Sequence, residues 1–461
     1  MLHSNIFAER RLKLRSQITD GLILFLGNTD VPYNYSSNTY QFRQDSTFSY
    51  FFGLNEPNLT GIIDVENNTE YLFGDDIDME DIIWMGYQPS LKDKASETGI
   101  SHTFPSKDIL RTIKQAQTSG RTIHFLPPYR SESILQLQGL LGIAAEKLTE
   151  KASSPLTKAV IKLRSVKDSW EIFEIEKMVD VAWLMHTTAM KMARPGILER
   201  EIAGTIEGIA LSHGNGVSFP VILSMNGETL HNHHHNNYLQ KGRLMLTDAG
   251  SEAETLYASD ITRTIPVGGR FDQRQKDIYN IVLAANRKTI ELTSPHRTYL
   301  DVHLEAAKTI ASGLKDLGLM KGNINEAVAA GAHALFFPHG LGHMLGLDVH
   351  DMEGLGETLV GYDETVTRSK QFGLAYLRFA KKPESGYVLT DEPGIYFIPA
   401  LIDQWRNEKK FPNFINYDNV ESYKDFGGIR IEDDLLVTEN GCRILGKPIP
   451  KTINEIENIM A

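Results

Sequence analysis

The chain has few residues of the kinds that several common function classes need. It has one cysteine, Cys442, in 461 residues, which excludes an internal disulfide framework and a cysteine-built zinc site. Basic residues are outnumbered by acidic ones, 47 against 59, and the formal net charge is -12. Because nucleic-acid binding requires a basic surface, we expect no nucleic-acid partner. No apolar run approaches the length that crosses a bilayer, so we expect no membrane partner either.

The remaining composition is that of an ordinary globular protein. Hydrophobic residues make up 41% of the chain and charged residues 23%. The N-terminal stretch MLHSNIFAERRLKLRSQ has charge where an export signal needs an apolar core, so we expect a cytoplasmic protein. A chain of this length is too long for one ordinary core, and two domains are predicted.

The first part of the chain alternates short apolar runs with polar segments. Buried strands are predicted at 21–27, 61–65, 70–74 and 122–127. Helical spacing covers 107–117 and 133–148. This alternation predicts an α/β domain over residues 1–160.

A long amphipathic helix opens the second part. Asp168 and Glu171 fit a capping pair, the apolar spacing continues to Met192, and Pro195 with Gly196 ends the run. Further helices are predicted at 198–213, 272–292 and 300–317, and strands at 216–225, 243–250 and 386–397. We therefore expect a second domain over residues 165–461.

Acidic residues stand within or at the ends of these later strands. Each could be a turn residue by itself, but the pattern repeats at Asp248, Asp260, Glu392 and Glu432. An unpaired charge in a buried strand is costly, so several of them require a counter-ion. Arg430 and Glu432 alternate with isoleucines, which predicts one sheet face for both charged groups.

Gathered together, four carboxylates would resist joint ionisation without cations. Two divalent ions would neutralise them, and a single histidine among oxygen ligands suits manganese, cobalt or iron. Paired ions about 3.5–4 Å apart can share a bridging hydroxide, a ready nucleophile at neutral pH. The residues alone thus predict metal-assisted hydrolysis.

A run of histidines in HNHHHNN, residues 231–237, offers a competing metal site. Adjacent side chains on an extended segment point to opposite faces, so one ion could not easily use them all. We interpret His233, His234 and His235 as part of a polar loop near the mouth of the cleft, with at most a weak, adventitious affinity for metal.

Four strings identify a family. DITRTIPV (260–267), HGLGHMLGLDVHD (339–351), DEPGIYF (391–397) and GGIRIEDD (427–434) resemble the dinuclear "pita-bread" metallopeptidases, which include methionine aminopeptidase, aminopeptidase P and prolidase. TYQFRQDSTFSYFFGLNEP (39–57) resembles the N-terminal domain that aminopeptidase P and prolidase share. The resemblance implies an α/β N-terminal domain followed by an α+β pita-bread catalytic domain.

The resemblance also implies a ligand set for two divalent metal ions, taken to be manganese. The five ligands would be Asp248, Asp260, His343, Glu392 and Glu432, with Asp260 and Glu432 bridging both ions. This chain departs from the family in one respect: eleven residues rather than ten separate Asp248 from Asp260. A one-residue change within a strand would reverse a side-chain face, so a turn or bulge must absorb it.

Further residues acquire roles by the same resemblance. His231, His339 and His350 would contact substrate, and the latter two would stabilise the oxyanion. Glu392 would also shuttle a proton to the leaving nitrogen. Two side chains would orient the ligand carboxylates, namely Tyr396 and Arg430.

The implied activity is hydrolysis of Xaa-Pro bonds in dipeptides or short peptides. A metal-free enzyme of this fold, as in creatinase, and an inactive binding protein are the alternatives, but here all five ligand positions carry binding side chains. Arg378, fourteen residues before Glu392, resembles a prolidase arginine and favours a dipeptidase over aminopeptidase P. The long connection between Glu392 and Glu432 is also prolidase-like.

Relatives of this type form homodimers or homotetramers, and we expect the same here. In them, one subunit's N-terminal domain borders the neighbouring active site. Trp84 is a candidate for that rim, although it could equally belong to the core.

Overall fold

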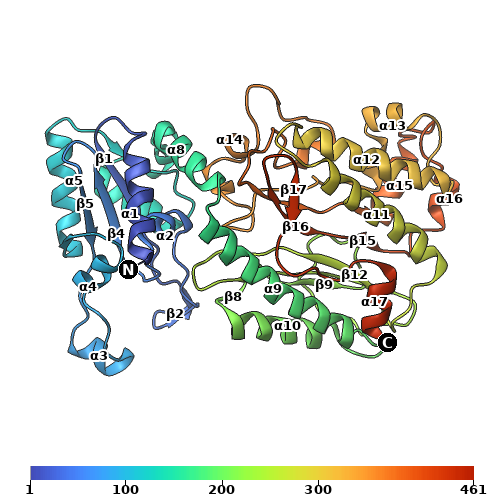
Figure 1. Cartoon of the computed structure of the whole chain (residues 1–461), viewed down its shortest axis with the longest axis horizontal. Coiled ribbons are helices and arrows are strands. Elements are labelled where there is room, and N and C mark those ends of the chain that lie inside the picture. Colours follow the sequence, from blue (N-terminus) through green and yellow to red (C-terminus); the bar gives the residue numbers. More distant parts are fainter. Residues whose placement is uncertain (1) are drawn as a thin grey trace. The chain divides into compact units, whose positions relative to one another are not determined.

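The computed structural model describes residues 2–461, and the chain divides into two compact units (Figure 1). The N-terminal unit ends at Arg164 and also takes in 354–356. The C-terminal unit comprises 165–353 and 357–461.

The N-terminal unit is built on a five-stranded sheet with the strand order β6-β5-β4-β1-β7. β4 runs antiparallel to both β1 and β5, while β7 and β6 run parallel to their neighbours β1 and β5. The strands are β1 (Leu22–Leu26), β4 (Thr60–Asp64), β5 (Thr69–Phe73), β6 (His102–Phe104) and β7 (Ile123–His124). A small separate ribbon pairs β2 (Pro32–Tyr35) with β3 (Asn38–Thr39).

Helices cover this sheet and supply its core. The core joins apolar residues of β1, β4 and β5 to buried residues of α5 and α6, such as Ile113 and Leu137. The helices are α1 (Leu2–Arg15), α2 (Ser46–Phe52), α3 (Met79–Met85), α4 (Leu91–Glu97), α5 (Ile109–Thr118), α6 (Ser131–Leu141), α7 (Leu148–Lys151) and α8 (Ser154–Ser165).

The predicted strands and helices of this unit are present, but two of them are shorter than predicted. Of the run at 122–127, only Ile123–His124 forms a strand, β7. α6 stops at Leu141 rather than continuing to residue 148, because Gly142 adopts a left-handed conformation (φ 70°) and caps the helix through Gln138. Trp84 on α3 is 79% exposed and so is not a core residue.

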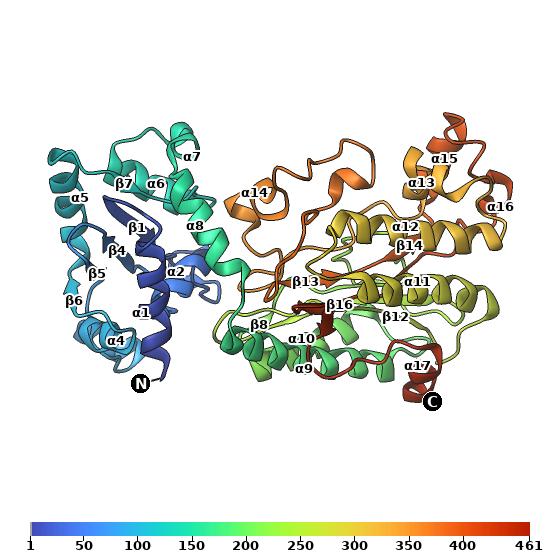
Figure 2. The ribbon, with the colours of Figure 1, turned by 45° about the horizontal axis from the view of Figure 1, so that its top comes forward.

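Two helix pairs frame the C-terminal unit (Figure 2). α9 (Ser169–Met192) packs on α10 (Glu199–His213), and α11 (Gln273–Leu292) packs on α12 (Tyr299–Asp316). Asp168 and Glu171 form the predicted capping box of α9. The shorter helices are α13 (Ile324–Ala330), α14 (Glu357–Gly361), α15 (Pro399–Asn407), α16 (Tyr417–Glu421) and α17 (Ile453–Met460).

Between the helix pairs lie four small antiparallel sheets, ordered β12-β10-β9, β11-β8, β13-β16-β17 and β14-β15. α11 packs against β13, β14, β15 and β17, whereas α10 packs against β8, β9 and β11. The strands are β8 (Gly216–Val217), β9 (Ile222–Ser224), β10 (Leu244–Asp248), β11 (Ser251–Glu252), β12 (Thr262–Pro266), β13 (Val388–Asp391), β14 (Gly394–Tyr396), β15 (Gly428–Arg430), β16 (Asp433–Val437) and β17 (Cys442–Ile444).

Two predicted strands are divided in the structure, and each division contains a proline. The segment 216–225 separates into β8 and β9 around Pro220, and 386–397 separates into β13 and β14 around Pro393. Proline has no N–H to donate to a sheet, which makes it a natural interruption. The second interruption contains Glu392, one of the predicted metal ligands.

Candidate metal centre

Glu392 and Glu432 occupy the same break in one two-stranded ribbon. Asp391 pairs with Asp433 on one side of the break and Gly394 with Arg430 on the other. The register is unchanged across the break, so Glu392 stands opposite Glu432. Released from the regular ladder, both side chains line one cavity.

The eleven residues between Asp248 and Asp260 form a small hairpin. It contains β11, a bridge between Glu252 and Ala258, and a tip where Leu256 has φ 70°. β10 and β12 keep a regular register beneath it, with Asp248 opposite Thr262. Both aspartates line the same cavity, so the altered spacing does not separate them.

His343 lies on an extended segment beside β13. Its carbonyl accepts from Thr390 N at 3.0 Å, and Leu341 O accepts from Glu392 N at 2.9 Å. A Cβ on Gly342 would lie 2.0 Å from Thr390 O, so only glycine allows this close approach. This contact brings His343 next to Glu392.

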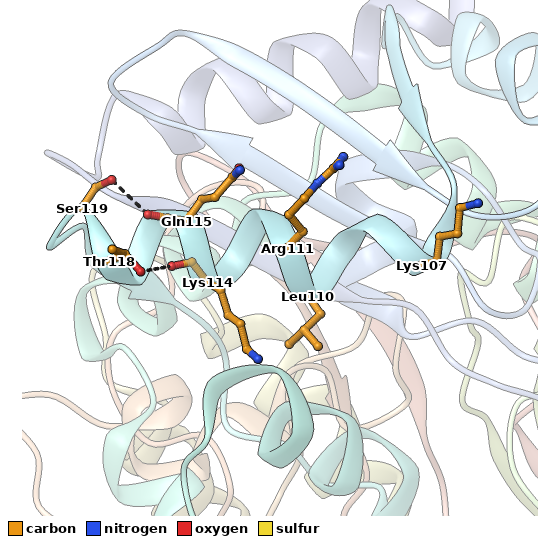
Figure 3. Close-up of a pocket in the computed structure, with 7 residues that line it drawn as sticks. All are labelled: Lys107, Leu110, Arg111, Lys114, Gln115, Thr118 and Ser119. Carbon is orange, nitrogen blue, oxygen red and sulfur yellow. Dashed lines mark hydrogen bonds between the residues drawn. The ribbon is translucent and has the colours of Figure 1, made fainter.

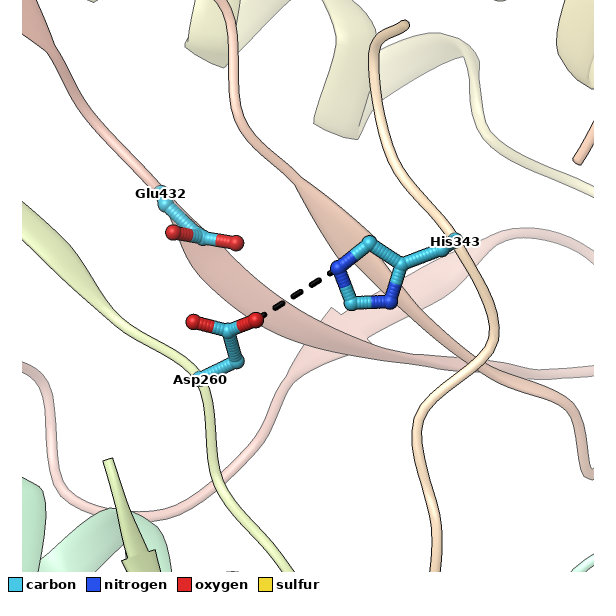
Figure 4. Close-up of side chains that lie close together, drawn as sticks. All are labelled: Asp260, His343 and Glu432. Atoms are coloured by element: carbon cyan, nitrogen blue, oxygen red, sulfur yellow. Dashed lines mark ion pairs between the residues drawn. The ribbon is translucent and has the colours of Figure 1, made fainter. Parts of the chain in front are cut away.

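Three side chains form the centre of the site (Figure 4). Ligand atoms of Asp260, His343 and Glu432 all lie within 4.8 Å of one another. His343 Nε2 is 3.4 Å from Asp260 Oδ2 and 3.7 Å from Glu392 Oε1. The Nδ1–H of His343 donates to Met344 O at 3.0 Å, which leaves the Nε2 lone pair directed at the carboxylates.

The carboxyl groups are poorly neutralised. Burial, and then the neighbouring Asp248, raise the pKa of Asp260 well above its usual value. Burial, and then Asp260, do the same to the pKa of Glu432. Burial raises the pKa of Glu392 to about 8 although Arg430 opposes the shift. Mutual repulsion in a low-dielectric site thus disfavours joint ionisation.

The guanidinium of Arg430 reaches the edge of this group. Arg430 Nη2 lies 2.5 Å from Asp248 Oδ2, and its Nε donates to Thr262 Oγ1, whose hydroxyl donates to Glu432 Oε2 at 2.6 Å. Among residues 2–461, the buried Oδ1 atoms of Asp248 and Asp260 have no hydrogen-bond partner. These orphaned oxygens and the free imidazole lone pair fit divalent metal ions.

The surrounding cavity has a volume of about 760 Å³. It is lined by all the predicted site residues except Tyr396, namely His231, Asp248, Asp260, His339, His343, His350, Arg378, Glu392, Arg430 and Glu432. Tyr396 is fully buried and its hydroxyl lies 2.9 Å from both Arg430 Nη1 and His339 Nε2. Apolar walls come in part from the long connections, through Phe372, Tyr376, Ile398 and Leu401.

The predicted substrate histidines are neutral near pH 7. Burial, and then Arg430, lower the pKa of His339 to about 3 and also lower the pKa of His231. Burial, and then His343, lower the pKa of His350 to about 4. Both ring nitrogens of His339 are within hydrogen-bonding distance of protein groups, because Nδ1 lies 2.7 Å from Gly340 O and Nε2 contacts Tyr396.

A buried carboxylate holds the histidine loop. Glu199 is fully buried at the start of α10 and accepts bonds from Met225 N, Asn237 N and Asn237 Nδ2. The structure places His233 as well as His231 in the cavity wall, whereas His235 bonds Leu223 O. His233 therefore belongs to a loop that borders the cavity, and its interpretation as a polar loop residue stays a prediction.

Sequence reasoning missed three polar residues around the site. Thr262 lies two positions after Asp260, and strand periodicity could have placed both on one face. Glu199 has no local sequence signal because its partners are distant in the sequence. Glu353 contacts Arg378, which is also distant, and His350, which a turn of the backbone brings close.

A second hollow, of about 600 Å³, lies along α5 of the N-terminal unit (Figure 3). Two of its polar side chains hydrogen-bond to backbone carbonyls of α5: Ser119 Oγ donates to Gln115 O, and Thr118 Oγ1 donates to Lys114 O. Arg111 pairs with Asp108 one turn away. This surface has no cluster of buried reactive groups and carries no evident chemistry.

Over residues 2–461, every helix falls short of the length and apolar character that a membrane span requires.

Comparison with known proteins agrees with this geometry. Residues 174–439 match metallopeptidase family M24, and 7–124 match the N-terminal domain of aminopeptidase P. The chain is 30% identical to Xaa-Pro dipeptidase of Homo sapiens over 98% of its own length and 91% of the relative's. A probable Xaa-Pro aminopeptidase of Metarhizium robertsii is 32% identical, over 91% and 88% of the two chains.

Solved structures extend the likeness to the fold. Escherichia coli aminopeptidase P with the inhibitor Pro-Leu is 30% identical and superposes with a TM-score of 0.81, covering 99% of this chain and 98% of that one. A zinc-substituted form of that enzyme in complex with product gives the same TM-score and coverage at 29% identity. The predicted fold, an aminopeptidase P-type N-terminal domain followed by a pita-bread catalytic domain, is confirmed. The chain belongs to metallopeptidase family M24.

Proposed function

We propose that this chain hydrolyses Xaa-Pro peptide bonds and that its preferred substrates are Xaa-Pro dipeptides. The observation that carries the proposal is the cluster of Asp260, His343 and Glu432 in a cavity that Arg378 also lines. Relatives named Xaa-Pro dipeptidase and Xaa-Pro aminopeptidase have similar identities to this chain, so identity favours neither substrate length.

The proposed centre holds two divalent ions, which we take to be manganese. Asp260 and Glu432 would bind both ions, Asp248 one of them, and His343 with Glu392 the other. In support, burial and the neighbouring acids raise the pKa values of Asp260 and Glu432 well above the usual range, and Glu392 lies beside His343. Such ions, when bound, supply a water nucleophile activated at neutral pH and polarise the scissile carbonyl.

The chain's own residues would then position substrate and move protons. Glu392, whose Oε2 lies 3.8 Å from His339 Nδ1 in the cavity, would carry a proton to the leaving nitrogen. His231, His339 and His350 would contact the substrate around the scissile bond. Tyr396 and Arg430 would hold His339 and Asp248 in place through the hydrogen bonds described above.

Arg378 provides the reason to favour dipeptides. A guanidinium recognises a free carboxylate by a charge-assisted, often bidentate pair, whereas a longer peptide offers a neutral amide at that position. Arg378 lines the cavity, and the connections that narrow it contribute Phe372 and Ile398. Domain limits of 1–160 and 165–461, cytoplasmic location and homo-oligomeric assembly stay predictions.

The test compares hydrolysis of Ala-Pro with that of Ala-Pro-Ala, with and without manganese. We expect Ala-Pro to be cleaved much faster. Arg378→Ala should raise the KM for Ala-Pro by about 10- to 100-fold, because a charge-assisted bond is lost, and change that for Ala-Pro-Ala little. Lys382→Ala, which removes an exposed positive charge nearby in the sequence, is the matched control.

Efficient cleavage of Ala-Pro-Ala with no dependence on Arg378 would assign the chain to aminopeptidase P instead. Absence of hydrolysis of both substrates by the manganese-loaded protein would contradict the proposed activity altogether and favour a binding role.

A further inference from the structure

A carboxylate behind the cavity wall contacts two of its lining residues. Glu353 Oε2 lies 2.6 Å from His350 Nδ1 and 3.2 Å from Arg378 Nε. His350 and Arg378 line the cavity, but Glu353 is not among the described residues that do so. One oxygen atom thus contacts two side chains that line the cavity.

The local backbone directs Glu353 toward His350. The Glu353 N–H donates to His350 O at 3.1 Å, which closes a tight turn. Within it, Met352 is buried and has φ 64°, a left-handed conformation that is uncommon for a residue with a side chain. The turn returns the chain so that Glu353 lies beside the imidazole three residues earlier.

The hydrogen bonds define where the protons lie. The bond from His350, with the nearby charge of Arg378, lowers the pKa of Glu353 to about 2, so Glu353 is ionised and can only accept. His350 Nδ1 therefore carries the shared proton, and Nε2 is the unprotonated nitrogen of the neutral ring.

Arg378 is held by one edge of its guanidinium. Its Nε donates to Glu353 Oε2 at 3.2 Å. Because Nε is occupied, the Nη groups are the donors left for a ligand in the cavity. Two such donors match the two oxygens of a carboxylate.

We propose that Glu353 is a positioning residue that orients Arg378 for the substrate carboxylate and fixes the protonated nitrogen of His350. The inference rests on the proposed dipeptidase function. Glu353 acts only through these two side chains. Its loss therefore affects a dipeptide, which uses Arg378, more than a tripeptide, which does not.

Kinetics of Glu353→Ala and Glu353→Gln test this. The alanine variant should raise the KM for Ala-Pro by about tenfold, which is the low end of the effect of losing a group that orients a binding residue. The KM for Ala-Pro-Ala should rise by less than about twofold. Glutamine keeps an acceptor oxygen in place, so it should restore the KM to within about threefold of the wild type. Glu364→Ala, which removes an exposed charge from a nearby loop, should match the wild type.

Three kinetic outcomes would overturn the proposal. Glu353→Ala could equal the wild type, Glu353→Gln could be as impaired as the alanine variant, or both could improve Ala-Pro cleavage. The last result would mean that the negative charge of Glu353 opposes the substrate carboxylate. A wild type that cleaves no Xaa-Pro substrate would instead contradict the proposed function.

A second measurement does not depend on activity. Nitrogen-15 NMR of the imidazole groups in the chelated full-length protein reports which nitrogen is protonated, with His350 assigned by its loss in His350→Gln. The Nδ1–H form is expected in the wild type and Glu353→Gln, and the Nε2–H form in Glu353→Ala. A wild type with His350 protonated at Nε2 would overturn the inference.

Discussion

Two buried aspartates, one in each unit, have opposite electrostatic environments. Asp64 ends β4 in the N-terminal unit, where both Nη groups of Arg121 and the side chain and backbone of Asn67 donate to it. Burial acts to raise its pKa, but these bonds hold the pKa below the usual value. Among residues 2–461, Asp260 Oδ1 has no hydrogen-bond partner, and Asp260 Oδ2 lies 3.4 Å from His343 Nε2. Burial, and then Asp248, raise the pKa of Asp260.

The same contrast occurs between neighbours on one strand. Asp433 is bonded to Arg263 and Lys451, which keep its pKa low despite burial, whereas the pKa of the adjacent Glu432 is raised. A buried acid is thus a candidate metal ligand only where the fold provides too few cations of its own. A raised pKa alone does not identify a ligand, because burial also raises the pKa values of Asp391 and Asp434. Asp260, Glu392 and Glu432 are acids with raised pKa values that also line the cavity.

The largest effect should come from Glu432→Ala. A ligand that serves two ions cannot be removed without losing both, so we expect hydrolysis to fall by more than about a hundredfold and metal content to approach zero. Metal analysis and Ala-Pro hydrolysis measure this. The control is Glu439→Ala, at an exposed position of the same hairpin, and it should retain both the metal and the activity. A Glu432→Ala variant that binds metal and is active would show that the electrostatic contrast has no functional meaning.

Asp64→Ala should show the reverse pattern. Loss of a paired, mostly buried carboxylate should lower the free energy of unfolding by about 1–3 kcal/mol, since Arg121 keeps Glu66 as a partner. The metal content and kcat/KM of the folded protein should stay within about twofold of the wild-type values. Losing one hydrogen bond in the active site would change kcat/KM by more than this. Denaturant unfolding measures the stability, and Glu146→Ala is the control. Loss of metal from Asp64→Ala would contradict the difference drawn between the two aspartates.

The smallest effect concerns pH. Glu392 has a folded-state pKa near 8, above the value expected when unfolded, so its contribution to stability is present at low pH and is lost as pH rises from about 4.5 to about 8. Asp260 and Glu432 shift in the same direction. The Tm of the chelated protein should therefore fall over this pH range relative to the Tm of the manganese-loaded protein. A Tm difference between the two forms that does not change with pH would show that the acids are already neutralised.

Much of the fold follows from local sequence signals. The apolar runs predicted β1, β4, β5, β7, β9, β10, β13 and β14, and the Asp168 capping pair predicted the start of α9. The short strands β2, β3, β6 and β17 were not predicted. The end of α6 was missed because a left-handed glycine outweighs helical spacing, and the strand at 386–397 was predicted whole although Pro393 interrupts it.

The site divides in the same way. Residues in strand context, such as Asp248 and Glu432, have a sequence signal because a charge in an apolar run needs explanation. Glu353 has none, since its proximity to Arg378 depends on a turn at Met352 and a contact across 25 residues. Those features are set by tertiary packing, which no short window of sequence contains.

The central claim is that the C-terminal acids lack enough cations and require two divalent ions. The most direct measurement is calorimetric titration of the chelated protein with manganese in buffers of different ionisation enthalpy, followed by metal analysis. We expect two ions per chain, proton release on binding because protonated carboxyl groups must ionise, and recovery of Ala-Pro hydrolysis. Full activity after exhaustive chelation, with no manganese uptake and no proton release, would contradict the claim.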